Sequence, residues 1–397
     1  MRLVSNRQIL NVFGAAVICL VSGSMTLAHG QAARGGQAAP GARPLMAEDV
    51  FKNVQVLRGI SVAEFMGTMG FISASLSLNC LDCHVNESAD DFAKYAVDTP
   101  IKQTARKMLL MVQTINKQNF GGITTVTCYT CHRSDVAPRF TPSLAEQYGT
   151  PAPRDPNDIE VVAQPAPGAP SADQILDKYI QALGGAQRLA GLSSYTGKGT
   201  YAGYDTDFGK IPTEIYAKAP AQRTTVVHLA GGDSTMAYDG NTGWIAATNT
   251  QLPMVAVTGG DLDGATLDAE FAFPSKIKQY LSAWHVGFPP TDVDDHHDVV
   301  VVEGTAPQGS RVKLFFDKDS GLLVRMVRFT KTVLGLNPSE IDYSDYRDVA
   351  GVKIPFKWTV TWTDGRSEFE MTDIQPNVPI DAAKFGKPAL PKSVNPY

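Results

Sequence analysis

The sequence predicts a multidomain protein, in which a mainly helical region is followed by a β-rich α+β region. Two pentapeptides of the form Cys-x-x-Cys-His occupy residues 80–84 and 128–132, and helical apolar spacing precedes each of them. Eight prolines between residues 138 and 170 then separate the pentapeptides from a long segment of strand-like alternation. We therefore expect a helical domain at residues 48–137, a semi-rigid linker at 138–170 and a β-rich domain at 171–397.

The length and composition fit a protein of two or three domains. The 397 residues are 43% hydrophobic and 19% charged, with a formal net charge of −5, and this mild acidity argues against nucleic acid as a partner. Four of the five cysteines belong to the two pentapeptides, and the fifth, Cys19, lies in an apolar run near the N-terminus. A processed chain would therefore have no thiol left for a disulfide.

The N-terminus has the pattern of an export signal. Arg2 and Arg7 form a positive region, residues 8–28 are mostly apolar, and small residues follow as a cleavage site. We expect a signal peptide at residues 1–30, which places the protein in the periplasm or on the periplasmic face of the membrane. Retention of the apolar run as a membrane anchor, or lipidation of the cysteine within it, are the alternatives.

Two amphipathic helices are predicted in the helical domain, after a flexible Gly-, Ala- and Pro-rich lead-in at residues 31–47. Ser61 and Glu64 form a capping-box pattern at the start of the first helix. Its apolar face comprises Phe65, Met66, Met69 and Ile72. Thr99 and Pro100 open the second helix, as N-cap and first helical residue. Its apolar face comprises Ile101, Ala105, Met108, Met111, Val112 and Ile115.

Each pentapeptide has the form that attaches a c-type haem covalently. The two thiols, Cys80 and Cys83 in the first and Cys128 and Cys131 in the second, add to the two vinyl groups of the macrocycle. We therefore expect two covalently bound haems, attached outside the cytoplasm, in agreement with the export signal.

The histidines of the pentapeptides, His84 and His132, are then the proximal ligands of the two irons. A zinc half-site, a thioredoxin-like dithiol and a structural disulfide also use Cys-x-x-Cys. None of these requires a histidine at the fifth position, and the pattern occurs twice, so the sequence favours haem.

The ligand on the opposite side of each iron is not determined by periodicity alone. A methionine there is typical of low-spin electron carriers, whereas an open position permits ligand or oxygen chemistry. Both predicted helices carry methionines, but methionine at helical spacing usually fills a core. From the residues alone, both interpretations of these methionines stay open.

Residues 50–135 resemble the cytochrome subunit of bacterial photosynthetic reaction centres. The stretches that carry the resemblance are residues 53–57, 61–65, 104–108 and 126–133. In that family each haem unit is a helix, a turn and a Cys-x-x-Cys-His helix, and in most units a methionine of the first helix completes the iron. The resemblance implies Met69 for the haem on Cys80 and Cys83, and Met108 for the haem on Cys128 and Cys131. Met66 and Met111 are the fallback ligands.

That family carries four haems in two pairs, whereas this chain has one pair of pentapeptides. The resemblance implies an electron carrier rather than an enzyme. Its partners are expected to be redox proteins, in a photosynthetic reaction centre or a respiratory complex. A dihaem peroxidase is the enzyme alternative, and it would need one iron without a sixth protein ligand, against which the paired methionine helices count.

The β-rich region begins with a helix predicted at residues 172–183, capped by Ser171 and ended by Gly184 and Gly185. Strands are predicted at residues 223–229, 299–303, 312–316, 322–329 and 356–362. Turns are predicted at residues 239–240, 319–321 and 364–365. Helices are predicted at residues 265–271 and 275–284. An acidic and histidine-rich run at residues 292–298 reads as a solvated loop rather than a metal site.

The β-rich region also resembles the superfamily of lipoprotein carriers and outer-membrane lipoprotein-sorting proteins, through residues 316–325 and 345–356. The resemblance implies a curved, antiparallel half-barrel with helices, which covers an apolar cavity able to hold acyl chains. A closed, filled barrel that only docks a partner is the alternative, because fold does not fix function. A second functional hypothesis follows: a lipid- or lipoprotein-binding module in which haem serves structure or sensing.

Overall fold

The computed structural model describes residues 44–89, 91–149, 157, 168, 170–248, 250, 252–287 and 298–390. The predicted signal peptide, most of the proline-rich run and residues 292–297 of the acidic run lie outside the described residues. The chain divides into residues 1–43 and residues 44–397, and the structure below concerns the second unit. None of the helices among the described residues has both the length and the apolar character to cross a membrane.

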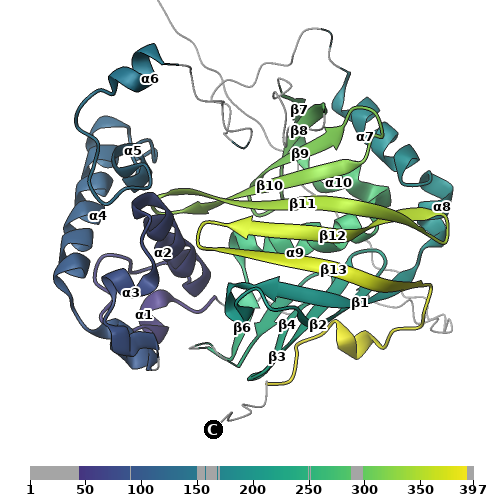
Figure 1. Cartoon of the computed structure of the whole chain (residues 1–397), viewed down its shortest axis with the longest axis horizontal. Coiled ribbons are helices and arrows are strands. Elements are labelled where there is room, and N and C mark those ends of the chain that lie inside the picture. The colour runs from purple at the N-terminus through teal and green to yellow at the C-terminus, as the bar shows by residue number, and fades with distance from the viewer. Residues whose placement is uncertain are drawn as a thin grey trace, which may run out of the picture. The chain divides into compact units, whose positions relative to one another are not determined.

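The N-terminal part of this unit is helical (Figure 1). Its α-helices are α1 (Ala47–Val50), α2 (Val62–Leu76), α3 (Cys80–Cys83), α4 (Pro100–Asn119), α5 (Cys128–His132) and α6 (Leu144–Tyr148). Two 3₁₀ turns, η1 (Asn86–Ala89) and η2 (Phe92–Ala96), connect α3 to α4. Helix α6 lies in the segment predicted to be an extended linker, so that segment is helical at its start.

The two long helices begin where their caps predict. The Ser61 hydroxyl accepts a hydrogen bond from the Glu64 N–H at 3.1 Å, and the Thr99 hydroxyl accepts one from the Lys102 N–H at 3.2 Å. Pro100 occupies the first turn of α4, as predicted. The reciprocal bond predicted from the Glu64 side chain to Ser61 is not among the capping bonds of α2.

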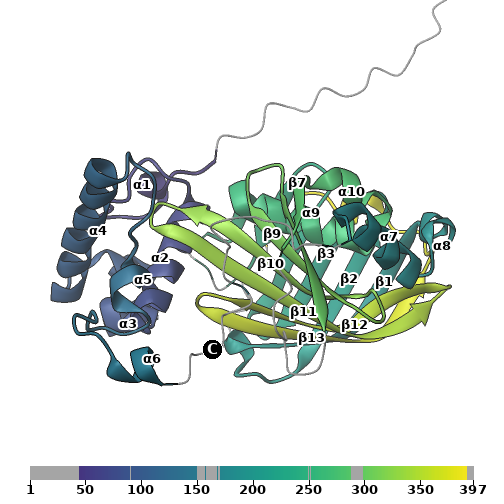
Figure 2. The ribbon, with the colours of Figure 1, turned by 90° about the horizontal axis from the view of Figure 1, so that it is seen from above.

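The C-terminal part is a 13-stranded antiparallel sheet, which curves strongly in the view of Figure 2. The strands are β1 (Ser194–Gly203), β2 (Ile211–Lys218), β3 (Gln222–Leu229), β4 (Gly232–Tyr238), β5 (Gly243–Ala246), β6 (Met254–Val257), β7 (Ser282–Val286), β8 (Val299–Thr305), β9 (Arg311–Asp317), β10 (Leu323–Thr332), β11 (Gly335–Val349), β12 (Val352–Trp362) and β13 (Gly365–Pro376). Their order is β6-β5-β4-β3-β2-β1-β13-β12-β11-β10-β9-β8-β7. The described sheet is therefore open, with β6 and β7 at its edges. The prediction of an antiparallel β-rich domain with helices is confirmed.

Four α-helices accompany the sheet: α7 (Ala172–Ala182), α8 (Ala186–Gly191), α9 (Gly259–Ala272) and α10 (Ile277–Tyr280). Helix α9 contacts β3, β4 and β6 from one half of the sheet and β10 from the other. The main core lies between the sheet and these helices, and Leu176, Leu267 and Phe316 are almost completely buried in it. Helix α7 begins at Ser171 with the predicted capping box and ends before two glycines with positive φ.

The helix predicted at residues 275–284 is wrong in its second half. Helix α10 ends at Tyr280, and residues from Ser282 form the edge strand β7. This strand pairs with β8, where His285 lies opposite Glu303. A short isolated helix has marginal stability, whereas pairing with an existing strand satisfies the same backbone hydrogen-bonding groups. The secondary structure of this segment therefore depends on its partner strand.

The helical part and the sheet share an apolar cluster. Leu334, in the turn between β10 and β11, is completely buried there with Leu57, Phe71 of α2 and Leu109 of α4. The Asn337 side-chain amide of β11 donates to the Gly67 carbonyl of α2 at 2.6 Å. The tip of one hairpin of the β-sheet is therefore part of the core of the helical region.

Candidate functional site

The first Cys-x-x-Cys-His stretch forms a single helical turn, α3, which is held by a capping box. The Asn79 side-chain oxygen accepts hydrogen bonds from the Leu81 and Asp82 N–H groups at 2.8 and 3.2 Å. The Asp82 carboxylate in turn accepts one from the Asn79 N–H at 2.7 Å. Cys80 is exposed, Cys83 is half-buried, and neither forms a disulfide. A helical turn places residues three apart on one face, so both thiols of the pair point the same way.

One nitrogen of the His84 ring is hydrogen-bonded to a backbone carbonyl. Its Nδ1 lies 3.2 Å from the Tyr95 carbonyl oxygen, and the Tyr95 ring packs edge-on at a centroid distance of 4.7 Å. A carbonyl can only accept a hydrogen bond, so Nδ1 must carry the hydrogen and a neutral ring keeps its lone pair on Nε2. Burial lowers the pKa of His84, and the neighbouring Lys102 ammonium lowers it further, which favours that neutral ring.

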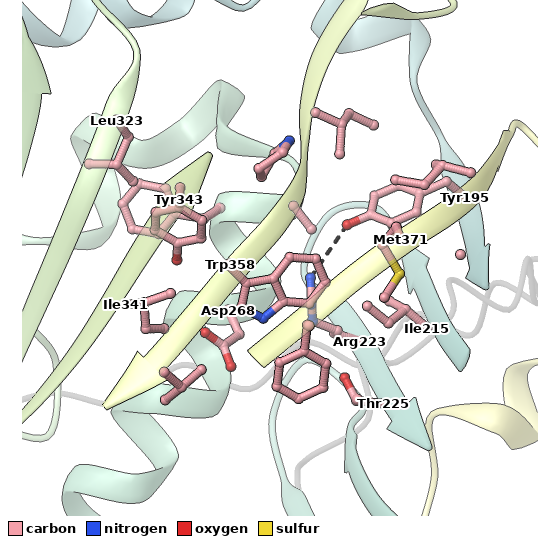
Figure 3. Close-up of a pocket in the computed structure, with 18 of the residues that line it drawn as sticks. Tyr195, Ile215, Arg223, Thr225, Asp268, Leu323, Ile341, Tyr343, Trp358 and Met371 are labelled. Carbon is pink, nitrogen blue, oxygen red and sulfur yellow. Dashed lines mark hydrogen bonds between the residues drawn. The ribbon is translucent and has the colours of Figure 1, made fainter. Parts of the chain in front are cut away.

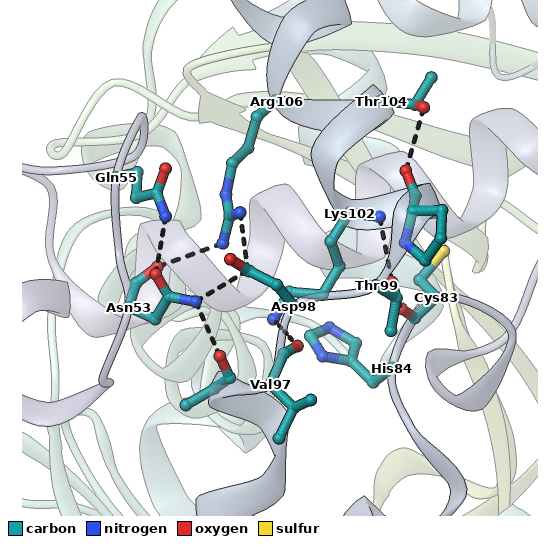
Figure 4. Close-up of polar contacts among 12 residues, drawn as sticks. Asn53, Gln55, Cys83, His84, Val97, Asp98, Thr99, Lys102, Thr104 and Arg106 are labelled. Atoms are coloured by element: carbon teal, nitrogen blue, oxygen red, sulfur yellow. Dashed lines mark hydrogen bonds and ion pairs between the residues drawn. The ribbon is translucent and has the colours of Figure 1, made fainter.

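The segment that supplies the Tyr95 carbonyl is held in place by polar side chains (Figure 4). Lys102 of α4 donates from Nζ to the Tyr95 and Val97 carbonyls, both at 2.7 Å. Asp98 accepts from Arg106 at 2.7 Å and from the Asn53 amide at 2.8 Å. These bonds tie the 95–98 segment to α4 and to the chain before α2, and so position the carbonyl that accepts from His84.

The second stretch repeats the arrangement of the first. The Thr127 hydroxyl accepts from the Thr130 N–H at 3.2 Å, and the Thr127 N–H donates to the Thr130 hydroxyl at 3.0 Å. Arg133 ends the turn in a left-handed conformation. The His132 Nδ1 then lies 3.1 Å from the Asp135 carbonyl oxygen. The same argument assigns the hydrogen to Nδ1 and leaves Nε2 free.

Asn116 of α4 positions the approach to the second stretch. Its buried side chain donates to the Val126 carbonyl at 2.8 Å and accepts from the Thr125 and Val126 N–H groups at 3.1 and 2.9 Å. Behind α5, the Ser134 N–H donates to the Ser75 carbonyl of α2 at 3.0 Å. The second pentapeptide is therefore held between α4 and α2, and α2 packs directly against α5.

The methionines named from the resemblance lie on α2 and α4, as predicted. Met69 is partly buried in the apolar cluster that also contacts Cys128, whereas Met108 is 41% exposed. The fallback residues Met66 and Met111 are also exposed. Met69 therefore lies on the helix that precedes the first pentapeptide and also packs against the apolar cluster that contacts Cys128 of the second pentapeptide. Which methionine binds which iron stays a prediction.

The donor set and its surroundings fit two c-type haems. Each stretch presents two free thiols and a histidine whose Nε2 is available. Large apolar side chains of the pentapeptides and of α4 remain exposed, and a planar apolar group could cover such side chains: Leu81, Tyr129, Ile101, Met108 and Met111. Burial raises the pKa of the Cys83 and Cys128 thiols, unlike the low pKa of a reactive dithiol. Within the described ranges, no three His, Cys, Asp or Glu side chains converge as a metal cluster.

Some residues that build these sites were missed from the sequence. The spacings Asn79-x-x-Asp82 and Thr127-x-x-Thr130 are capping signals and could have been read as such. Lys102 and the buried Asn116 act through backbone groups distant along the chain, and no local pattern marks them. The Nδ1 contacts of the histidines likewise depend on how loops return to the pentapeptides.

A separate cavity of about 490 Å³ lies within the β-rich region (Figure 3). Most of its lining is apolar or aromatic, including Tyr195, Tyr343 and Trp358. Four charged residues also line it: Arg223 of β3 and Asp268 of α9, which are partly buried, and Asp205 and Lys353, which are exposed. An open sheet with such a cavity corresponds to the half-barrel expectation rather than to the closed, filled barrel.

Comparison with known proteins confirms the first resemblance. Residues 26–154 match the family described as the photosynthetic reaction centre cytochrome C subunit. The chain is 40% identical over 113 residues to the photosynthetic reaction center cytochrome c subunit of Rubrivivax gelatinosus, covering 26% of this chain and 29% of that protein. It is 32% identical over 124 residues to that of Thermochromatium tepidum, covering 30% and 28%. The chain spans less than a third of the length of these curated relatives. The similarities support a c-type cytochrome role for the N-terminal region.

Solved structures are similar to the β-rich region. A LolA superfamily protein from Nitrosomonas europaea aligns with a TM-score of 0.36 and 15% identity, covering 55% of this chain and 99% of that chain. A DUF1329 family protein from Desulfovibrio piger aligns with a TM-score of 0.38 and 12% identity, covering 54% and 96%. These neighbours include the superfamily that the β-rich sequence resembles.

Proposed function

We propose that this chain is an extracytoplasmic dihaem c-type cytochrome that carries electrons. The observation that carries the proposal is the repeated geometry of His84 and His132, each with Nδ1 held by a backbone carbonyl and Nε2 free. Metal-ligating histidines characteristically donate their second N–H to such an acceptor, which fixes ring orientation and tautomer. The paired thiols, the exposed apolar side chains of the pentapeptides and of α4, and the cytochrome similarities support the same function.

The chain's own residues have defined roles in this proposal. Cys80 and Cys83 hold the first haem, and Cys128 and Cys131 hold the second. His84 and His132 are the proximal ligands, orientated by the Tyr95 and Asp135 carbonyls. Met69 and Met108 are the proposed distal ligands. A haem bound in this way supplies a one-electron iron couple, and the two capped helical turns keep the thiols and the imidazole in fixed relative positions.

The proposed partners are redox proteins of the periplasmic face, in a membrane-bound reaction centre or a respiratory complex. The cytochrome relatives support this assignment, but they have more than three times the length that this chain matches. We also propose that residues 1–30 are a signal peptide, that 31–47 are a lead-in, that 48–137 form the dihaem domain, and that 138–170 link it to the β-rich domain at 171–397.

The test is expression of the full chain with a periplasmic haem-attachment system. We expect the intact mass of the exported protein to equal the mature chain plus two haems. The double variant with Cys128→Ser and Cys131→Ser should retain one haem, as should the variant with Cys80→Ser and Cys83→Ser. A mature protein of unmodified mass would refute the proposal. Rapid turnover of hydrogen peroxide by the reduced protein would instead identify the peroxidase alternative.

The apolar cavity favours a second candidate function, the binding of a lipid or acyl chain by the β-rich region. A volume of about 490 Å³ with a mostly apolar lining is within the range of ligand-binding cavities. Lipid released by organic extraction of the purified protein, and identified by mass spectrometry, would support this function. If delipidated protein takes up no amphiphile of any head-group class, the second function is wrong.

A further inference from the structure

The charge pair of this cavity consists of Arg223 and Asp268, two partly buried residues of opposite charge that line it without forming an ion pair with each other among the described residues. Arg223 reaches the cavity from β3, where it donates to the Tyr195 hydroxyl at 3.4 Å and lies over the Trp358 ring at 5.8 Å. Asp268 enters from α9 (Figure 3). The carboxylate of Asp268 has electrostatic neighbours in Arg223 and Arg328. Arg328 donates hydrogen bonds to the Gly260 carbonyl and the Thr330 hydroxyl.

The Asp268 carboxylate lines the cavity and lacks a hydrogen-bond donor among the described residues. A carboxylate oxygen that faces a cavity without a protein donor can accept a hydrogen bond from a ligand. Burial raises the pKa of Asp268, while the two guanidinium groups oppose that rise. Asp268 is therefore a group in this cavity whose hydrogen-bonding capacity is available to a ligand.

The charge pair also decides which head group the cavity can accept. A free fatty acid would bring a second carboxylate beside Asp268, and like charges repel strongly where water is excluded. An uncharged hydroxylated head has no such penalty. One of its hydroxyl groups can donate to Asp268, and its oxygen can accept from Arg223. The apolar and aromatic lining would surround the chain of the same molecule.

We propose that the cavity binds an amphiphile with a single apolar chain and an uncharged hydroxylated head, such as a monoglyceride or a long-chain alcohol, and that Asp268 excludes free fatty acids. This inference rests on the second candidate function, because it concerns the same cavity. It adds a selectivity that an apolar lining alone does not provide. Asp268 is the residue that determines it, and Arg223 is its counter-charge.

The test compares three probes with the same chain, monododecanoylglycerol, dodecan-1-ol and dodecanoic acid, by equilibrium dialysis against the delipidated full-length protein at pH 8. We expect both uncharged probes to bind the wild type at least about tenfold more tightly than dodecanoate, the scale of one hydrogen bond to a charged group. The variant Asp268→Asn keeps the shape of the side chain and removes its charge. Its affinity for dodecanoate should rise at least about tenfold, because the like charge is removed and Arg223 can still pair with the ligand carboxylate.

The matched control is Glu270→Gln on the same helix, outside the cavity lining, and it should leave all three affinities unchanged. The double variant Arg223→Gln with Asp268→Asn should lose the gain in dodecanoate binding. Thermal unfolding of each variant verifies that it is folded. If dodecanoate binds the wild type as tightly as the uncharged probes, or if Asp268→Asn does not change its affinity, the selectivity is refuted while lipid binding stands. If none of the three probes binds the wild type, the second function fails as well.

Discussion

Leu334 at the tip of the β10–β11 hairpin is packed in one apolar cluster with Phe71 of α2, and its side chain is completely buried. A β-carbon on the adjacent Gly335 would lie 2.7 Å from the Phe71 ring and 3.3 Å from the Thr127 methyl group, so the backbone here approaches the helices closely. Thr127 caps the second haem-binding turn. The sheet therefore supplies part of the core on which that turn rests.

Replacing Leu334 by Ala should destabilise the protein by about 2–5 kcal/mol, because it removes buried methyl groups and leaves a cavity between the hairpin and α2. The free energy of unfolding, from urea denaturation followed by circular dichroism, measures this effect. Leu336→Ala is the control, since Leu336 is 39% exposed in the same hairpin, and it should change stability by less than about 0.5 kcal/mol. Equal effects of the two variants would show that the hairpin tip is not a core element.

Replacing Asn116 by Ala should loosen the second pentapeptide. The change leaves the Thr125 and Val126 N–H groups without their acceptor, and we expect a loss of about 2–4 kcal/mol in the free energy of unfolding. Asn119→Ala, in the exposed last turn of the same helix, is the matched control and should be nearly neutral. Hydrogen exchange should report the loosening at residues 125–132 before it appears elsewhere. Protection that is unchanged in that segment would contradict this role for Asn116.

Replacing Met69 or Met108 by Ala tests the proposed distal ligands. Each variant of the haem-loaded protein should lose about half of the methionine-to-iron charge-transfer band in the oxidised visible spectrum, because one of two axial sulfurs is removed. Met66→Ala and Met111→Ala are the controls on the same two helices, and their spectra should match that of the wild type. If a control variant loses the band instead, the fallback methionine is the ligand on that helix.

Alkaline pH should destabilise the β-rich region through Tyr201. Burial is the main cause that raises the pKa of Tyr201 to about 12 in the folded protein, from an ordinary value of 10.0. The folded state therefore keeps the phenol proton where the unfolded state has lost it. Stability from this group is complete below pH 10 and falls as pH rises to about 12.

The check is the slope of the unfolding free energy against pH over that range. Tyr201→Phe has no phenol proton to lose and should make the slope less steep by the share of one group, because other tyrosines of this region, such as Tyr216, also have a raised pKa. Tyr204→Phe, at an exposed position of the same region, is the matched control. A wild-type stability that stays constant from pH 10 to 12 would rule out the protonation linkage.

Much of the architecture could be predicted because it depends on short-range patterns. Ser61, Thr99 and Ser171 cap helices that begin where the sequence places them, since a cap involves only the next three residues. The strand predicted at 312–316 lies within β9. The edge strand β7 was mistaken for helix because its fate depends on a partner strand about twenty residues away. Local propensity does not include that pairing.

By itself, the sequence determined that two Cys-x-x-Cys-His turns follow two methionine-bearing helices, and that a β-rich region follows a proline-rich segment. These features are local, because ligand spacing and helix capping act within a few residues. Only the tertiary structure decided that the Tyr95 and Asp135 carbonyls orient the two histidines, that Leu334 enters the helical core, and that Arg223 and Asp268 share one cavity. Such contacts join groups that folding brings together from separate elements, so their energy appears only when the whole chain packs.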